Sequence, residues 1–145
     1  MDTHDTLNSI LVKLFNDIMD IEEKALITDE FKDITVTDMH IIEAIGVKEA
    51  KRMTIIARTI GVTTGTLTIG VNGLVKKGYV TRTRSEEDRR VVYASLTAKG
   101  KAAYVHHMKF HKNMIAAVKE GMSEEEAVVL TKTLHKLEGF FGKYM

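Results

Sequence analysis

Residues 61–100, GVTTGTLTIGVNGLVKKGYVTRTRSEEDRRVVYASLTAKG, decide the fold. The sequence predicts a helix with an uncharged polar face, which Gly78 ends. Its last turn holds Lys76 and Lys77, whose positive charges suit the negative end of the helix dipole. Residues 79–84 and 91–96 are rich in strand-forming side chains, and the segment between them predicts a hairpin. A polar helix beside a basic hairpin is an arrangement suited to reading the major groove of DNA while gripping the adjacent backbone.

The segments before this stretch predict further helices. Apolar spacing predicts a long helix over residues 5–27, followed by a connection over residues 28–36. Thr37 is predicted to cap a short helix over residues 38–45, and residues 47–52 are predicted to form a loop. Most of the first half of the chain is therefore expected to be helical.

Two short helices joined by a glycine-containing turn precede the hairpin, which is the pattern of a helix-turn-helix. Thr54 is predicted to cap the first of them and Gly61 to end it. Thr63 or Thr64 is predicted to cap the second, which we call the reading helix. The predicted buried face of the reading helix holds Leu67, Val71 and Leu74.

Long helices are predicted after the hairpin. Thr97 can cap a helix that reaches about Glu120, and Ser123 with Glu126 forms a capping box for a last helix. The three long helices carry more apolar surface than a winged core of this size covers, so we expect them to pair with a second chain. The predicted fold is mostly α with a small β-hairpin wing: a single domain over residues 1–145, with a winged helix-turn-helix at about 37–97 and dimerisation helices at about 5–27 and 98–143.

Charge is distributed unevenly along the chain. The formal net charge is only +1. Residues 1–50 hold 4 Lys/Arg against 12 Asp/Glu, a balance of −8, whereas residues 51–100 hold 10 against 3, a balance of +7. Residues 101–145 hold 7 against 5, a balance of +2. The basic block coincides with the helix and hairpin, which favours a basic face that neutralises DNA phosphates.

Bulk properties exclude several classes of protein. The sequence has no run of 18 apolar residues that would span a membrane, and its acidic start is not a signal peptide. It has no Cys, and hence neither disulfides nor thiolate chemistry. We therefore expect a cytoplasmic protein.

Enzymatic activity is not expected. No nucleophile with a base at a recognisable spacing appears, and the glycines at 61, 65, 70, 73 and 78 do not form a phosphate-cradling loop. We also expect no cofactor. A winged domain that binds only other proteins would leave the basic wing unexplained.

The reading helix offers hydroxyl and amide groups to DNA. Threonine hydroxyls bond bases or phosphates, threonine methyls pack on thymine, and an Asn amide reads adenine. The first three turns of the helix carry neither Arg nor Lys, so bidentate reading of guanine is excluded there and an A·T-rich half-site is expected. The candidate DNA-binding residues of the helix-turn-helix are Thr54, Thr63, Thr64, Thr66, Thr68, Asn72, Lys76 and Lys77.

The predicted wing supplies four more candidate DNA-binding residues, Arg82, Arg84, Arg89 and Arg90. A narrow A·T-rich minor groove attracts an inserted guanidinium, and Arg89 is the candidate for that insertion. Asp88 would repel phosphate. We predict instead that it pairs with Arg90 and fixes the shape of the wing.

The wing sequence D-x-R (Asp88, Arg90), followed by L-T-x-x-G (Leu96, Thr97, Gly100), resembles the winged helix-turn-helix of the MarR family of bacterial regulators. The predicted helix order extends the resemblance over nearly the whole chain. It implies an obligate homodimer that binds a pseudo-palindromic operator in double-stranded DNA and usually represses transcription. It also implies an effector site between the winged lobe and the dimerisation helices.

Further segments, IEEKALI, FKDI, MHIIEAIG, RSEEDRRV, KFHK and GMSEEE, are similar to the fatty-acid-synthesis repressors of that family, the FabT type. This resemblance implies a corepressor, a long-chain acyl group carried on acyl carrier protein. Its acyl chain would enter a tunnel bordered by the first long helix and the helix after the wing. Met and aromatic residues at helical spacing are also ordinary core residues. The candidates for the tunnel are Phe15, Ile18, Met19, Ile42, Phe110, His111 and Met114.

Histidines leave a second kind of effector open. His107 and His111 stand four residues apart on one predicted helix, a spacing that lets both bind one metal ion. The family resemblance implies that His40 and Glu22 lie near them, and some MarR-type proteins sense zinc there. The absence of Cys counts against this reading. The alternative to the FabT type is a MarR-type regulator of another regulon that senses zinc or a small aromatic compound. The sequence determines neither the operator nor whether the effector strengthens or weakens DNA binding.

Overall fold

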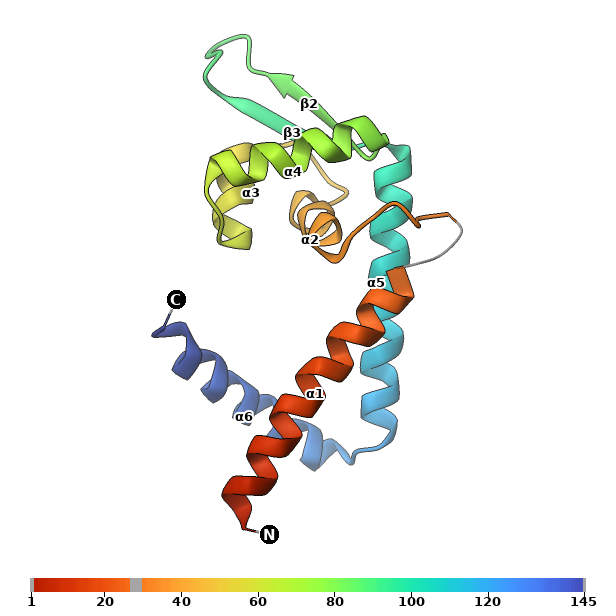
Figure 1. Cartoon of the computed structure of the whole chain (residues 1–145), viewed down its shortest axis with the longest axis vertical. Coiled ribbons are helices and arrows are strands. Elements are labelled where there is room, and N and C mark those ends of the chain that lie inside the picture. The colour runs from red at the N-terminus through yellow and green to blue at the C-terminus, as the bar shows by residue number, and fades with distance from the viewer. Residues whose placement is uncertain (1, 27–29, 145) are drawn as a thin grey trace. The chain divides into compact units, whose positions relative to one another are not determined.

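Six helices and three short strands make up the part of the chain that the structure describes, residues 2–26 and 30–144 (Figure 1). The structure is a computed structural model, and the chain divides into two compact units at residues 108 and 109. In chain order the elements are α1 (Thr3–Leu26), α2 (Val36–Ile45), β1 (Lys51–Arg52), α3 (Met53–Ile60), α4 (Thr64–Lys77), β2 (Val80–Arg84), β3 (Val92–Leu96), α5 (Ala98–Glu120) and α6 (Glu124–Gly142).

The first helix and the connection after it agree with the predicted pattern where the structure describes them. Helix α1 begins two residues before the predicted start at residue 5. The predicted end at residue 27, and residues 28 and 29 of the predicted connection, lie outside the described residues. Residues 30–35 have no helix or strand and lead directly into α2.

Helix α2 begins earlier than the sequence pattern suggests. The prediction that Thr37 caps this helix is wrong, because Thr35 is the cap. The Thr35 hydroxyl accepts a hydrogen bond from the Asp38 backbone N–H at 3.0 Å, and the Asp38 carboxylate accepts one from the Thr35 N–H at 3.2 Å. These two bonds satisfy two N–H groups reciprocally. The partner is an Asp in place of the usual Glu or Gln, which conceals the capping box in the sequence.

The helix-turn-helix is delimited by glycines, as predicted. Gly61 and Gly78 end α3 and α4 with φ angles of 74° and 88°, the left-handed conformation that a residue with a Cβ rarely adopts. Thr63 is the cap of α4, and its hydroxyl accepts the Thr66 backbone N–H at 3.1 Å. Helix α4 is therefore the predicted reading helix, with its boundaries fixed by local sequence.

The segment before α3 differs from the prediction. Residues 47–52 were expected to form a loop, but the last two form strand β1, which pairs antiparallel with β3. The prediction that Thr54 caps α3 is also wrong, since the cap position is Arg52 and no side chain bonds to the helix there. The reason is that β1 runs directly into the helix, and Thr54 falls within its first turn.

The strands form a three-stranded antiparallel sheet in the order β1-β3-β2. Strands β2 and β3 make the predicted hairpin, with Val80 opposite Leu96 and Arg84 opposite Val92. Figure 1 shows the hairpin extending beyond α4. The turn between the strands thus lies at the free end of the hairpin, away from the start of α5.

One hydrophobic core holds α2, α3, α4 and the sheet together. The predicted buried face of α4, Leu67, Val71 and Leu74, is fully buried in it. The other large side chains of this core include Met39, Ile42, Ile45, Ile56 and Tyr79. This packing fixes α4 and the hairpin to one body, so the groups they expose keep a defined spacing.

Helices α1 and α6 keep large apolar side chains in solvent. On α1, Leu7 is 54% exposed and Phe15 69%. On α6, Leu134 is 53% exposed and Phe141 54%, and none of the residues of this helix is buried. Stripes of this kind are the surfaces that protein interfaces cover.

No single helix in the described ranges is long and apolar enough to cross a membrane. Helices α3 and α4 together have the length and apolar composition of a span, but they are bent by 105° relative to each other.

Gly100→Ala should lower the free energy of unfolding by about 1–3 kcal/mol, the usual cost of overpacking. A Cβ there would lie 2.1 Å from the Tyr79 carbonyl oxygen, which is backbone and cannot move aside. Gly73→Ala is the matched control, because nothing lies within 4 Å of a Cβ at that position, and it should stabilise α4 by about 0.5–1 kcal/mol. Urea denaturation of both variants measures this, and equal midpoints would contradict the packing described.

Candidate DNA-binding surface

The solvent face of α4 carries most of the predicted polar readers. Thr64, Thr66, Asn72 and Lys76 are exposed, and Thr68 is half-buried. Some hydroxyls already have partners within the helix. Thr63 donates to the Thr66 hydroxyl at 2.9 Å in addition to capping, and Thr68 donates to the Thr64 carbonyl at 2.8 Å. In this conformation Thr68 offers DNA an acceptor and a methyl group rather than a donor.

Ile69 is a residue of this face that the polar pattern did not reveal. Its side chain is 75% exposed, although isoleucine is usually buried. By helical spacing it stands beside Gly65, Asn72 and Lys76, at the centre of the face that α4 turns to solvent. An apolar side chain there fits contact with a thymine methyl group. The signal in the sequence was its position, an apolar residue outside the buried stripe.

The loop of the wing is shaped by Asp88. Its Oδ1 accepts bonds from the Arg90 Nε and from the Arg90 backbone N–H, each at 3.1 Å, and its Oδ2 accepts one from the Arg90 Nη2 at 3.2 Å. The predicted Asp88–Arg90 pair is thus present. These bonds, with the charge of nearby Arg52, lower the pKa of the Asp88 carboxyl, so it stays ionised at neutral pH.

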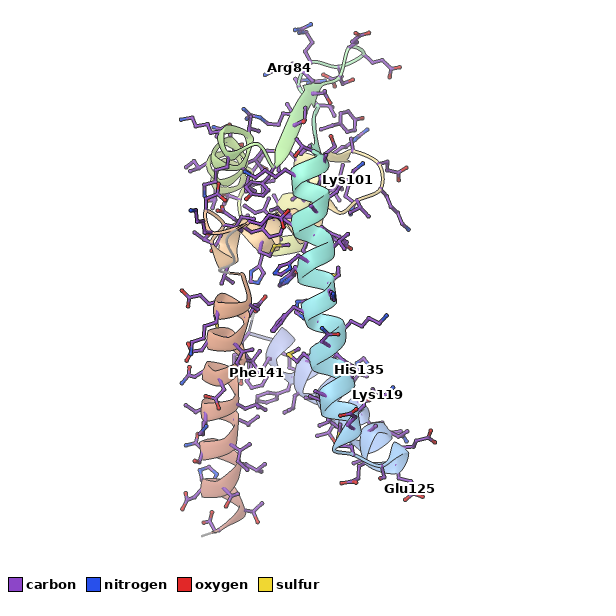
Figure 2. The ribbon with its side chains drawn as sticks, turned by 90° about the vertical axis from the view of Figure 1, so that its right-hand side faces the viewer. Arg84, Lys101, Lys119, Glu125, His135 and Phe141 are labelled. Carbon is purple, nitrogen blue, oxygen red and sulfur yellow. The ribbon has the colours of Figure 1, made fainter. Side chains whose placement is uncertain are left out.

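A second contact braces the same loop. The Arg84 Nη1 donates to the Arg89 carbonyl at 3.0 Å, and the Ser85 backbone N–H donates to the Val91 carbonyl at 2.9 Å. Arg84 stands on the hairpin, well away from the start of α5, where Lys101 is labelled (Figure 2). The Arg89 side chain is exposed on this braced loop, and its insertion into a groove stays a prediction.

A groove of about 670 Å³ separates the helix-turn-helix from the wing. It brings together six of the predicted DNA-binding residues, Thr54, Thr64, Thr68, Arg82, Arg84 and Arg90. It also contains Arg52, which sequence reasoning missed because the segment before α3 was interpreted as a loop. Four guanidinium groups and several hydroxyls along one groove are suited to holding a phosphate backbone.

The two lysines at the end of α4 lie in different surroundings. Lys76 is exposed. Lys77 donates to the Asp38 carboxylate at 2.8 Å, and its side chain is 34% exposed. The ammonium of Lys77 therefore ties α4 to α2, and any role in DNA binding remains a prediction.

The candidates for an acyl tunnel are divided between the two compact units. In the first unit, Phe15, Ile18 and Met19 are exposed on α1, whereas Ile42 is fully buried in the winged core. Phe110, His111 and Met114 are partly buried and lie in the second unit. Whether these residues line one tunnel stays a prediction.

Two of the histidine candidates, His40 and His107, lie close to carboxylates within the first unit. The buried His107 has its Nε2 at 3.4 Å from the Glu22 Oε1 and at 3.6 Å from the Glu43 Oε2. The His40 Nε2 lies 3.7 Å from the same Glu22 oxygen. Glu43 was not among the predicted ligands. His111 stands one turn after His107 on α5.

Comparison with known proteins gives the same assignment from the sequence and from the fold. A model of the MarR family matches residues 34–92. The HTH-type transcriptional regulator SarZ of Staphylococcus saprophyticus is 35% identical over 112 residues, which are 77% of this chain and 73% of SarZ. The chain belongs to the MarR family. The predicted fold class, mostly α with a winged helix-turn-helix, is thereby confirmed.

Two further proteins are similar to this chain, one by sequence and one by structure. The HTH-type transcriptional repressor YetL of Bacillus subtilis is 36% identical over 82 residues, and the chain spans about half of its length, 49%. The crystal structure of Streptococcus pneumoniae FabT in complex with DNA is similar to this MarR-family chain with a TM-score of 0.91 and 39% identity, over 98% of this chain and 99% of that one. The protein is therefore a DNA-binding transcriptional regulator and not an enzyme, as predicted.

Arg89→Ala should weaken binding to the operator by roughly 1–3 kcal/mol, because one guanidinium in a groove is lost. Here the operator is the duplex that the wild-type protein selects from a randomised pool, and affinity is measured at fixed salt. Arg89→Lys keeps the charge without the planar fork and should recover only part of the affinity. An unchanged affinity for Arg89→Ala would contradict the wing assignment.

Lys76→Ala should weaken binding to the operator and to random duplex about equally, and should lower the slope of log affinity against log salt by about one unit. Both effects are expected of a lost phosphate contact. Lys76→Arg, which keeps the charge, serves as the control and should preserve the slope. A loss confined to the operator would instead make Lys76 a reader of bases.

Proposed function

We propose that this MarR-family protein is a homodimeric repressor of fatty-acid-synthesis genes that responds to long-chain acyl groups carried on acyl carrier protein. The observation that carries the proposal is its similarity to FabT, which extends along nearly the whole chain rather than over the winged segment alone. The segments outside the wing that resemble FabT-type repressors support the same conclusion. As a regulator of bacterial genes, it would act in the cytoplasm.

The exposed apolar stripes support a homodimer. Leu7 and Phe15 on α1, and Leu134 and Phe141 on α6, are each at least half exposed in the single chain. Burying a fully exposed side chain of this size contributes about 1.5–3 kcal/mol, and covering these half-exposed ones would contribute roughly half of that each. Summed over both stripes, this would favour association. A dimer with two-fold symmetry presents two reading helices, and its operator is then expected to be pseudo-palindromic.

The chemistry of α4 supports a preference for A·T-rich half-sites. Before Lys76 the helix carries no Arg or Lys, which are the side chains that read guanine most often. The exposed Ile69 and the threonine methyls fit thymine instead. An inserted Arg89 would fit the narrow minor groove of an A·T-rich flank.

A second candidate effector is zinc, and the surroundings of His107 favour it. Two ligands on one tetrahedral zinc ion, each about 2.0–2.1 Å from it, stand about 3.3 Å apart. The Nε2 of His107 lies 3.4 Å and 3.6 Å from two carboxylate oxygens, close to that separation. With His40 near Glu22, the first unit holds an imidazole and carboxylate donor set of the kind that zinc binds.

Acyl carrier protein loaded with a long acyl chain should raise the affinity of the wild-type protein for its operator by about fivefold or more, the usual size of an allosteric coupling. Unacylated carrier protein should have no effect. Met19→Arg should remove the response without weakening basal operator binding. An unpaired guanidinium is costly to bury in an apolar tunnel, so it would either fill the tunnel or hold it open to water. Asn16→Arg adds the same charge to α1 at a polar position and should respond as wild type does.

Met19 is 55% exposed on the apolar stripe of α1, so native mass spectrometry must show that the variant remains a dimer. If the operator affinity of the wild-type protein does not change with acylated carrier protein but does change with Zn²⁺, the zinc proposal replaces the acyl proposal. A Met19→Arg variant that still responds to the acyl species would remove Met19 from the tunnel.

A further inference from the structure

The corner between the reading helix and the wing is tied to a distant part of the chain. Tyr79 stands at this corner, between the end of α4 at Gly78 and the start of β2. Its side chain is fully buried, and its hydroxyl donates to the Asp33 Oδ1 at 2.6 Å. Asp33 lies in the connection between α1 and α2, 46 residues earlier.

This hydrogen bond joins a neutral phenol to an ionised carboxylate. Burial, and then the bond to Asp33, raise the pKa of the Tyr79 hydroxyl far above its usual range, so the proton stays on the tyrosine. The same bond lowers the pKa of the Asp33 carboxyl. A bond to an ionised acceptor is stronger and more directional than one between neutral groups.

A third segment meets the same corner. The ammonium of Lys99, in the first turn of α5, lies 4.4 Å from the centre of the Tyr79 ring and 4.0 Å from the Asp33 Oδ2. It also donates to the Lys77 carbonyl at the end of α4, at 3.1 Å. The end of the reading helix is therefore held between the start of α5 and the connection that contains Asp33.

Ring contacts continue from this corner to the last turn of α1. The Phe31 ring lies 6.5 Å from the Tyr79 ring and 5.4 Å from the His106 ring. The His106 Nε2 lies 3.1 Å from the Ala25 carbonyl oxygen. A contiguous set of contacts within the first unit thus links α1 to the end of the reading helix.

We propose that Tyr79 and Asp33 are positioning residues for operator recognition, and that the bond between them sets the orientation of the reading helix and the wing. Specific binding needs both elements in register with their grooves, whereas random duplex is held by phosphate contacts that tolerate misalignment. Loss of the bond should therefore lower specificity rather than overall affinity. The inference goes beyond the acyl proposal and does not depend on it.

The test compares Tyr79→Phe and Asp33→Ala with wild type on the operator and on a scrambled duplex of equal length and composition. We expect each variant to lose about tenfold in operator affinity, equivalent to about 1.4 kcal/mol, with affinity for scrambled duplex within about twofold of wild type. The double variant should lose no more than the larger of the two single losses, since both substitutions remove the same bond. Asp33→Asn keeps an acceptor oxygen and should recover most of the operator affinity.

Tyr104→Phe is the matched control, because it removes a hydroxyl from another tyrosine packed against the same core and should leave both affinities unchanged. Thermal melts must show that the variants are folded at the assay temperature. An equal loss on both duplexes would indicate general destabilisation and would overturn the proposal. So would an unchanged operator affinity for Tyr79→Phe, or fully additive losses in the double variant.

Discussion

One hydroxyl group, that of Thr97, joins the end of the reading helix to the start of α5. It donates to the Gly78 carbonyl at 2.6 Å and accepts the Gly100 backbone N–H at 3.1 Å, while the Thr97 backbone N–H donates to the Tyr79 carbonyl at 3.0 Å. The close packing of Gly100 against Tyr79 leaves no room for a side chain. The L-T-x-x-G sequence of this chain thus has a physical basis, because it fixes where the wing begins and where the long helix starts.

Local signals in the sequence were sufficient for most of the fold. Gly61 and Gly78 end their helices, and Thr63 caps the next one, because each effect needs only a few neighbouring residues. The stripe of α4 was also predictable, since its period places Leu67 and Leu74 on one face. The cap at Thr35 was missed because several hydroxyl and carboxylate residues stand in sequence there, and local propensity alone does not choose among them.

The features that the sequence did not reveal depend on distant partners. Strand β1 is two residues long, too short to show an alternating pattern, and it exists only because β3 lies beside it. Arg52 enters the groove for the same reason, and so no motif marks it. The bond between Asp33 and Tyr79 joins residues that no periodicity connects, and it becomes visible only once the core has brought them together.

The number of basic residues in 51–100 is larger than the number of positive side chains that the surface offers to DNA. Several of the basic residues in 51–100 hold the protein's own backbone or carboxylates. Lys51 donates to the Ala44 carbonyl at 3.0 Å, Lys77 pairs with Asp38, and Lys99 lies against Tyr79. Part of the acidic excess of residues 1–50 is used in the same contacts, through Asp33 and Asp38. Because counterion release follows the phosphates that are neutralised, the salt dependence of binding should reflect the wing, the groove and Lys76 rather than the full basic block.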